Sequence, residues 1–470
     1  MFFMISISDN ETYSNLLIFK FKNFQMEYPE NIKSILKFSG NTGENRELEC
    51  INTLGKCSYK NIFILGIGTT EEFNSVKLFK TLGSAILKLK NSLSELDILP
   101  TFPNDFNYTI GESLQIALYK YNGIKKIEEQ IQLQNINIIS KYKDSINKGL
   151  IIGRSINYSR QLVNMPSNYV TPKYIVKQAE DIARSENLDI QILDKYMLKQ
   201  LGMNCICSVG KGSIHNPYLI IMQYFGNPRD KQILSLIGKG VTFDTGGISL
   251  KPSKGMENMI SDMAGASSVL CVMKCISKLK PKKNIIALIP VVENMPSGSA
   301  YKPGDVIITY SGKTVEVVNT DAEGRLILCD AISYAKELGS TTIIDIATLT
   351  GSCANFLGNI NIGLLSNSNQ LANNIIECGK NVGENFWRLP NNNEYMNELK
   401  SDAADIKNTS TKCGAILGGM FLQSFCEDIN FAHIDIAGCA YSSKSSSPYD
   451  KGANAMPTRT LIEYIMKSDK

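Results

Sequence analysis

The octapeptide Asn319-Thr320-Asp321-Ala322-Glu323-Gly324-Arg325-Leu326 combines two carboxylates with a guanidinium. Asp321 and Glu323 are two residues apart, so in an extended segment both side chains would face the same side. An apolar pattern with helical spacing begins at Leu326, which predicts that a strand ending at Val318 turns here into the start of a helix. A helix N-terminus presents free N–H groups and a positive dipole to an anion or to metal-bound oxygen atoms. The octapeptide therefore predicts a site for ion or metal chemistry.

A glycine-rich stretch, residues 238–252, is a second candidate. It follows an apolar run and carries Lys239, Asp244 and Lys251. Its glycines let the backbone approach another group closely. The G-x-x-x-x-G-K-[ST] order of a phosphate-binding loop is missing, which argues against a nucleotide site. Shortly downstream, Asp262 adds another carboxylate, which we expect to lie on a helix.

Four carboxylates stand out in these stretches: Asp244, Asp262, Asp321 and Glu323. Four like charges in one cleft raise one another's pKa and favour protonation, whereas two divalent cations would neutralise them. Oxygen-rich donor sets suit zinc, manganese, magnesium or cobalt. Histidine-rich zinc sites are excluded, because the chain has only His215 and His433 and no H-E-x-x-H motif.

These motifs resemble those of the leucine aminopeptidase family, the hexameric dizinc cytosol aminopeptidases. The octapeptide is similar to the family signature, residues 238–252 to its first metal-binding block, and Ser261–Ala266 to the next. The similarity covers roughly residues 150–470 and is weak before residue 140. It continues through Val292–Gly298, Tyr301–Val306, Ala347–Gly351, Trp387–Pro390, Ser401–Asp405, His433–Gly438 and Pro457–Leu461.

The resemblance implies two divalent metal ions per subunit, with zinc first and manganese, magnesium or cobalt as alternatives. Asp244 and Glu323 would bridge both ions. Asp321 would complete one site, and Lys239 with Asp262 would complete the other. Lys239 would have to coordinate as the neutral amine, so the metals must strongly depress its pKa from about 10.4.

The resemblance also implies the catalytic groups. Lys251 would stay protonated and polarise the scissile carbonyl or hold the developing oxyanion. Arg325 would hold a bicarbonate ion that acts as the general base, and a water molecule bridging the metals would be the nucleophile. The pocket for the first side chain would be small and apolar, which favours leucine-like or methionine-like residues. Its lining would be Met259, Thr348, Leu349, Gly351, Ala437 and Ala440.

Three departures from the family pattern occur in the C-terminal part. Leu417-Gly418-Gly419 stands where Thr-Ala-Ala is usual, Phe431 where tryptophan is common, and Ala455-Met456 where Gly-Arg is usual. None is an implied metal ligand. We expect them to change packing or pocket shape and to leave catalysis intact.

Composition narrows the class of protein. A chain of 470 residues exceeds one hydrophobic core, and 43% hydrophobic with 20% charged residues is ordinary for a soluble globular protein. The net charge of +4 and the scattered basic residues argue against nucleic acid or an anionic membrane. Twelve cysteines without a CxxC pair favour reduced thiols. With no signal-peptide pattern and no long apolar run, we expect a cytoplasmic protein without a membrane span.

The pattern of elements predicts an α/β protein of two domains. Residues 1–140 alternate strand-like and helix-like segments, which predicts a smaller N-terminal α/β domain. Residues 141–171 form a linking helix, with periodicity over Lys143–Asn164 that ends before two prolines. Residues 172–470 form the larger catalytic domain, with a mixed central sheet flanked by helices. We expect strands at 61–68, 96–99, 131–138, 189–193, 218–224, 233–236, 284–292 and 341–346, and helices at 76–89, 173–185, 258–278 and 323–338.

The main hypothesis is a metal-dependent leucyl aminopeptidase, a hydrolase that removes N-terminal apolar residues from peptides with a free amine. By resemblance it would be a homohexamer, a dimer of trimers. A non-enzymatic binding or regulatory protein on the same scaffold is the alternative, since some family members bind DNA; the intact Lys251 and Arg325 positions argue against it. A dimetal phosphoesterase is a third hypothesis, disfavoured by the lysine ligand and the two histidines.

Overall fold

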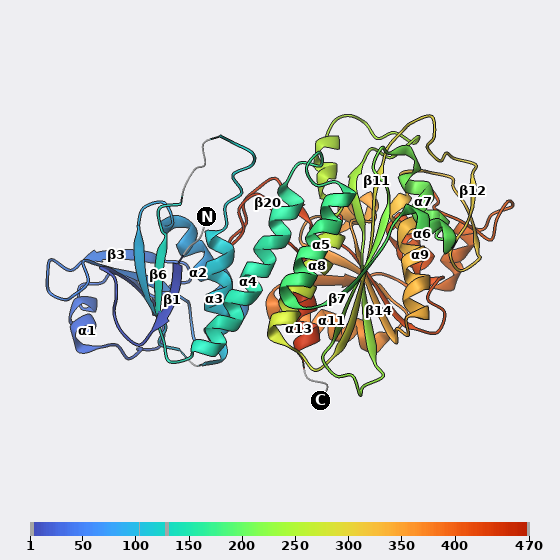
Figure 1. Ribbon diagram of the computed structural model, residues 1–470. Helices are drawn as coiled ribbons and strands as arrows, with labels where there is room; N and C mark the ends of the chain where they lie inside the picture. The colour runs from blue at the N-terminus through green and yellow to red at the C-terminus, as the bar shows by residue number, and fades with distance from the viewer. Residues whose placement is uncertain (1–3, 103, 127–130, 468–470) are drawn as a thin grey trace. The chain divides into compact units, whose positions relative to one another are not determined.

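The computed structural model describes residues 4–102, 104–126 and 131–467. The chain forms two compact units: Met1–Asn157 with Ser443–Lys451, and Tyr158–Ser442 with Gly452–Lys470. Both are α/β, as the sequence predicts (Figure 1). Helix α4 (Lys143–Asn164) leads from the first unit into the second, so the division falls inside this helix. The return of Ser443–Lys451 to the first unit was not predicted.

The first unit contains a six-stranded sheet in the order β1-β6-β5-β2-β4-β3. All neighbours are parallel except β3, which is antiparallel to β4. Its strands are β1 (Met4–Ser8), β2 (Asn15–Lys20), β3 (Leu48–Asn52), β4 (Asn61–Gly66), β5 (Glu95–Leu99) and β6 (Asn135–Ile139). Its helices are α1 (Glu30–Leu36), α2 (Ser75–Leu89), the 3₁₀ turn η1 (Asn104–Phe106) and α3 (Asn107–Leu118).

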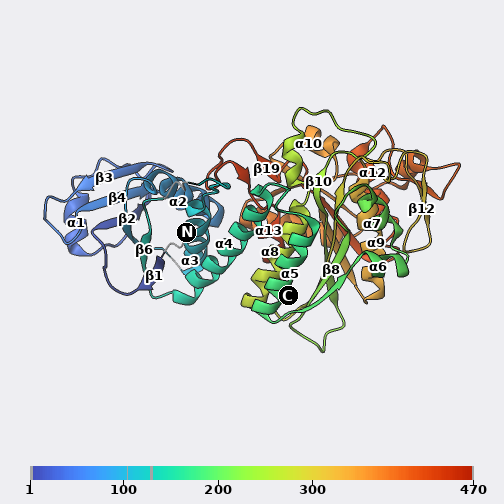
Figure 2. The ribbon, with the colours of Figure 1, turned by 45° about the horizontal axis from the view of Figure 1, so that its top comes forward.

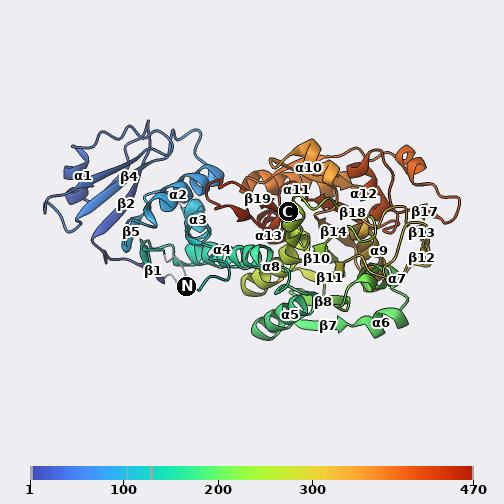
Figure 3. The same ribbon diagram turned by 90° about the horizontal axis from the view of Figure 1, so that it is seen from above.

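Both faces of this sheet are covered by helices. Leu17 and Phe19 of β2 pack with α2 and α3, whereas Leu16 and Ile18 pack with α1. This alternation follows from the two-residue period of a strand, and continuous apolar strands are what a sheet buried on both faces requires. Helices α2 and α3 lie side by side on one face, as Figures 2 and 3 show.

The segment Ser443–Lys451 completes the first unit. Within it, the carboxylate of Asp450 lies 2.9 Å from the ammonium of Lys90, which is buried. The hydroxyl of Ser447 donates a hydrogen bond to the carbonyl of Lys80 at 2.9 Å. A buried cation of the first unit thus depends on a carboxylate from near the end of the chain.

The second unit contains a mixed sheet in the order β16-β15-β18-β14-β9-β11-β8-β7, with β10 paired to β11. Its strands are β7 (Asp189–Leu193), β8 (Tyr218–Phe225), β9 (Ile233–Gly238), β10 (Gly240–Asp244), β11 (Asn284–Asn294), β14 (Thr342–Ala347), β15 (Asn361–Ser366), β16 (Asn385–Arg388) and β18 (Asn430–Asp435). Small sheets are formed by β12 (Val306–Ile308), β13 (Thr314–Glu316) and β17 (Ile406–Lys407), and by β19 (Tyr441–Ser442) and β20 (Gly452–Ala453).

Helices cover this sheet in two layers. Helices α5, α8, α11 and α13 lie on one face, and α6, α7, α9 and α12 on the other (Figure 3). The described helices are α5 (Pro172–Glu186), α6 (Lys195–Gln200), α7 (Asn204–Val209), α8 (Ala264–Leu279), α9 (Glu323–Glu337), α10 (Gly351–Leu357), α11 (Asn369–Val382), α12 (Gly414–Gln423) and α13 (Thr458–Met466), with 3₁₀ turns η2 (Gly210–Gly212), η3 (Met256–Ser261) and η4 (Asn393–Leu399).

Helix α5 begins with a side-chain cap. Thr171 caps α5 by accepting a hydrogen bond from the N–H of Tyr174, and Pro172 occupies the first turn. Among the described residues one stretch, Met256–Leu279, is long and apolar enough to cross a membrane by length and composition. Most of its apolar window is buried, because α8 packs on the central sheet.

The strand expected over 131–138 begins only at Asn135. Two predictions near the site were also wrong. The strand expected up to Val318 ends at Glu316, and Asn319–Ala322 forms a turn, since the backbone must reverse to start α9. The helix expected over residues 258–278 is interrupted: η3 ends at Ser261 and α8 begins at Ala264. Asp262 lies in this interruption and not on a helix.

Candidate metal centre

The charged residues of the two candidate stretches lie at the carboxyl ends of the central strands. Lys239 connects β9 to β10, and Asp244 ends β10 beside Asn294, the last residue of β11. Glu323 opens α9, where the helix dipole favours a negative side chain. Ligands of α/β sheets usually bind at this end of the strands, so the sheet places the site where chemistry is expected.

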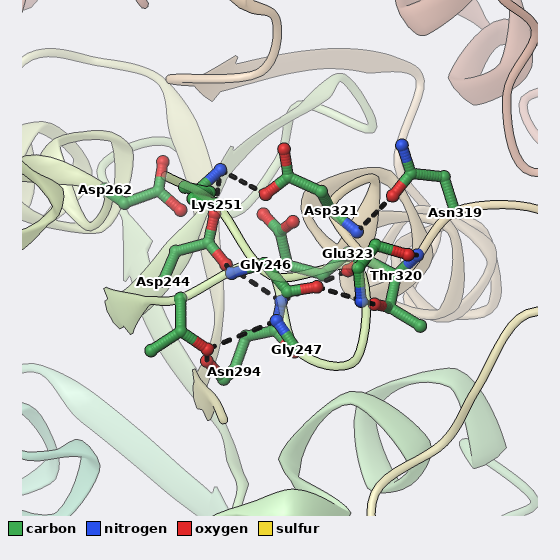
Figure 4. Close-up of polar contacts among 12 residues, drawn as sticks. Asp244, Gly246, Gly247, Lys251, Asp262, Asn294, Asn319, Thr320, Asp321 and Glu323 are labelled. Carbon is green, nitrogen blue, oxygen red and sulfur yellow. Dashed lines mark hydrogen bonds and ion pairs between the residues drawn. The ribbon is translucent and has the colours of Figure 1, made fainter. Parts of the chain in front are cut away.

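Three carboxylates form the centre of the site. One oxygen atom from each of Asp244, Asp262 and Glu323 lies within 4.8 Å of the others, and all three residues are buried. Asp321 is less buried and faces the same cluster through the turn before α9 (Figure 4). The structure therefore brings together the four acids identified in the sequence.

Lys239 is the cation inside this cluster. Its ammonium lies 2.8 Å from Oδ1 of Asp262 and 2.8 Å from Oε1 of Glu323, and donates to the carbonyl of Thr348 at 2.9 Å. Gly324 allows the approach, because a Cβ there would lie 2.6 Å from Cε of Lys239. Burial alone would lower the pKa of Lys239, but the surrounding carboxylates hold it above its ordinary value.

Lys251 lies at the more open side of the cluster. Its ammonium is 2.7 Å from Oδ2 of Asp244 and also pairs with Asp321. The backbone returns it there through Gly246 and Gly247, both with positive φ. A Cβ at Gly246 would lie 2.4 Å from the carbonyl oxygen of Ser249, so the turn requires glycine.

The interruption between η3 and α8 gives Asp262 its direction. Its Oδ1 accepts hydrogen bonds from the hydroxyl of Thr348 at 2.7 Å and from Lys239 at 2.8 Å. A position inside a continuous helix would have fixed this side chain to the helix surface. The two-residue break frees it to face the carboxyl ends of the strands.

The cluster fits divalent cations by two observations. Within the part of the chain that the structure describes, Oδ2 of Asp262 and Oε2 of Glu323 are buried and have no hydrogen-bond partner. Burial raises the pKa of Asp262, Lys239 only partly counters it, and the charges of Glu323 and Asp244 raise it further. Burial likewise raises the pKa of Asp321. Buried carboxylates with unshared oxygen atoms are the donors that divalent cations bind.

Two residues that carried no role in the sequence analysis orient the acids. The amide of Asn294 donates to Oδ1 of Asp244 at 2.8 Å and to the carbonyl of Thr320 at 3.1 Å. The hydroxyl of Thr320 donates to the carbonyl of Gly246 at 2.5 Å and accepts the N–H of Ser249 at 2.8 Å. Asn294 is the second polar residue after the apolar run Ile285–Val292, and a polar pair at the end of a buried strand is a usable signal.

Arg325 lies in the first turn of α9 and is buried. One terminal nitrogen donates to the carbonyl of Asn408 at 2.9 Å, while its Nε has no partner among the described residues. Burial lowers the pKa of Arg325 to about 10, against the raising effect of Glu323 and Asp435. A buried guanidinium with an unshared N–H is suited to an anion.

The residues expected to line the substrate pocket are only partly brought together. Asp435 accepts the N–H groups of Leu349 at 3.2 Å and Ala437 at 3.1 Å, which joins two of the expected segments. Thr348 contacts the cluster through Asp262. Met259 lies in η3 and accepts the N–H of Asp262 at 3.2 Å. Gly351 opens α10 and is exposed, and Ala440 is buried three residues after Ala437.

The sequence was compared with known families and proteins. A profile of the cytosol aminopeptidase family, catalytic domain, matches residues 157–462. The chain belongs to the cytosol aminopeptidase family. Two relatives named probable cytosol aminopeptidase are each 38% identical to it: that of Alkaliphilus metalliredigens (strain QYMF) over 91% of this chain and 89% of the relative, and that of Clostridium tetani (strain Massachusetts / E88) over 97% of each. The resemblance in the sequence is thereby confirmed.

A solved structure agrees with this membership. The bottromycin maturation enzyme BotP in complex with Mn superposes with a TM-score of 0.87 at 25% identity, over 96% of this chain and 99% of that one. Family membership gives the broad activity of a metal-dependent aminopeptidase, a peptide hydrolase, as expected from the sequence.

Proposed function

We propose that this cytosol aminopeptidase holds two divalent cations through five side chains. Asp244 and Glu323 would contact both ions, Asp321 one of them, and Asp262 with Lys239 the other. The observation that carries the proposal is the group of buried carboxylates, two of whose oxygen atoms have no partner within residues 4–102, 104–126 and 131–467. Zinc or manganese suits this donor set, and BotP is described in complex with Mn.

The cations, when bound, would lower the pKa of a water molecule and stabilise developing negative charge. Lys239 would coordinate as the neutral amine, because the cations replace its positive charge beside Asp262 and Glu323. Lys251 keeps its proton, since neighbouring carboxylates hold its pKa above the ordinary value although burial opposes them. Its ammonium can therefore donate to the carbonyl oxygen of the scissile bond.

Arg325 supplies the second cationic group. We infer that it would hold a bicarbonate ion, which would supply a general base. The supporting observations are its burial and its Nε, which has no partner among the described residues. In this scheme the nearby carboxylates serve as metal ligands and are not free to act as the base. The bicarbonate would take that role.

The substrate is a peptide with a free N-terminal amine and an apolar first residue such as leucine. Its pocket would be formed by small or apolar residues: Met259, Thr348, Leu349, Gly351, Ala437 and Ala440. Of these, Thr348 and Met259 contact Asp262, and Leu349 and Ala437 contact Asp435. We further propose a cytoplasmic homohexamer, a dimer of trimers, by family membership alone. Analytical ultracentrifugation tests that assembly.

One assay tests the function. Protein reconstituted with Zn²⁺ or Mn²⁺ should hydrolyse leucyl amide and leave N-acetyl-leucyl amide and a phosphate ester intact. Equal rates on the free and acetylated substrates would show that the amine is not recognised. Hydrolysis of the phosphate ester alone would instead identify a phosphoesterase, and inactivity on all three a binding protein.

A further inference from the structure

Asn408, immediately after β17, uses every polar group it has on the segment that carries the signature octapeptide. Its side-chain oxygen accepts the N–H groups of Val318 at 2.9 Å and Asn319 at 3.4 Å. Its side-chain nitrogen donates to the carbonyls of Asn319 at 2.7 Å and Ala322 at 3.5 Å. The residue is 0% exposed, so water does not compete for these bonds.

The backbone of Asn408 adds two further bonds to the same segment. Its N–H donates to the carbonyl of Glu316 at 2.8 Å, which extends the pairing of β13 with β17. Its carbonyl accepts a hydrogen bond from the guanidinium of Arg325 at 2.9 Å. One residue therefore contacts the segment before, inside and after the turn.

Asp321 lies between the two points that the Asn408 amide holds. Asn319, clamped on both its N–H and its carbonyl, in turn accepts the N–H of Asp321 with its side-chain oxygen at 2.8 Å. Ala322, on the other side, is the last residue before α9. The turn is not part of a sheet. The bonds of Asn408 therefore hold its two ends, while Thr320 between them is held by Gly246, Ser249 and Asn294.

A second buried asparagine, Asn284, makes the same kind of hydrogen bonds away from the site. Asn284, at the start of β11, accepts the N–H of Asn227 at 3.1 Å and donates to the carbonyls of Asn227 and Asp230 at 2.8 Å each. It is 3% exposed and lies at the opposite end of β11 from Asn294. Asn284 thus holds a loop that carries none of the proposed ligands.

We propose that Asn408 is a positioning residue for catalysis, which sets the direction of the Asp321 carboxylate and of the Arg325 guanidinium together. This rests on the proposed function, in which Asp321 is a ligand of one ion and Arg325 holds an anion. Groups that orient metal ligands typically contribute about 10- to 100-fold in metal affinity or activity. Asn408 acts on the ligand through the backbone of the turn.

The experiment compares Asn408→Asp with Asn284→Asp in the full-length protein. Each change replaces a donating amide by a carboxylate that faces two carbonyl oxygens, so each should lower the unfolding temperature. Calorimetric titration with Mn²⁺ should show two ions in the wild type and in Asn284→Asp. In Asn408→Asp one ion should bind about 10- to 100-fold more weakly. Its kcat on leucyl amide should fall with KM nearly unchanged, as for an interaction made in the transition state.

Asn408→Ala is the second variant, for the case in which Asn408→Asp does not fold, and the same outcomes apply to it. Two ions bound as in the wild type with unchanged kcat would overturn the proposal while leaving the proposed function intact. Equal losses in Asn284→Asp would overturn it too, by showing a general effect of stability. A wild type that binds no Mn²⁺ or lacks aminopeptidase activity would overturn the proposed function itself, and this inference with it.

Discussion

In the first unit the buried carboxylate of Asp97 has neutral donors at both oxygen atoms. Its Oδ2 accepts the N–H groups of Thr12 and Tyr13 and the hydroxyl of Tyr59, and its Oδ1 accepts the amide of Asn137. In the second unit the buried carboxylates of the metal centre face one another and two lysines, and two of their oxygen atoms lack partners among the described residues. Both units are α/β with largely parallel sheets.

The difference separates a structural charge from a functional one. A buried carboxylate that is fully hydrogen-bonded is stabilised where it is and needs no ion. One that keeps an unshared oxygen beside other acids is stable only if a cation or a proton arrives. Burial of an acid therefore does not identify a site; the signal is several buried acids that face one another and keep unshared oxygen atoms.

The largest expected effect on turnover is in Glu323→Ala, which removes a central member of the acid cluster. Aminopeptidase activity should fall by more than the roughly 100-fold typical of groups that only orient ligands. Metal content, measured by elemental analysis, should fall with it. Full metal content at the wild-type rate would contradict the difference between the two units, since Glu323 would then be a structural carboxylate like Asp97.

Lys251→Ala should have the next largest effect. Losing a donor aimed at a developing oxyanion costs about 2.7 to 4 kcal/mol, or roughly 10² to 10³ in kcat. Both metal ions should remain bound, because Lys251 is not a proposed ligand. The check is kcat and metal content on the same samples. Metal lost in proportion to activity would make Lys251 part of the metal site itself.

Arg325→Ala should reduce kcat less, by about 10- to 100-fold, the range for groups that act beside a metal centre. Its residual activity should respond weakly to added bicarbonate, because the anion has lost its buried guanidinium. A bicarbonate titration of wild type and variant measures this. If the variant responds to bicarbonate as the wild type does, Arg325 does not bind the anion.

Asp97→Asn should have the smallest effect on turnover, with kcat and metal content unchanged. Its amide would meet N–H donors where a carboxylate accepted them, and an unsatisfied buried group costs about 1 to 3 kcal/mol. The free energy of unfolding, from urea denaturation, should fall by that amount. Loss of metal in this variant would contradict the distinction between the two units.

The elements that the sequence predicts are those whose signals are local. Helix α4 has the predicted bounds, Lys143–Asn164, since Pro166 and Pro172 prevent its continuation. Strands β11 and β14 read as continuous apolar runs because both faces of the sheet are covered. The break at Asp262 was missed, because the apolar periodicity continues across it and the cause, the attraction to Lys239 and Thr348, is tertiary.

The four acids of the candidate site were likewise predicted from local signals. The residues that position them were not, because their contacts join distant parts of the chain. The four acids lie in short recognisable motifs, so their types and order identify them. Asn408 has no such signal: its partner Asn319 is 89 positions away in the chain. Only the pairing of β13 with β17 makes them neighbours. The placement of Asp321 by a distant amide is thus a property of the fold.

The return of Ser443–Lys451 to the first unit bears on how the protein is made. Residues 1–157 leave the ribosome long before Asp450 is synthesised. During that interval Lys90 lacks the carboxylate that lies 2.9 Å from it in the finished protein. In the meantime its ammonium has the carbonyl of Ala117, to which it donates at 3.2 Å, but no counter-charge. The first unit therefore acquires this ion pair only after most of the second unit has been translated.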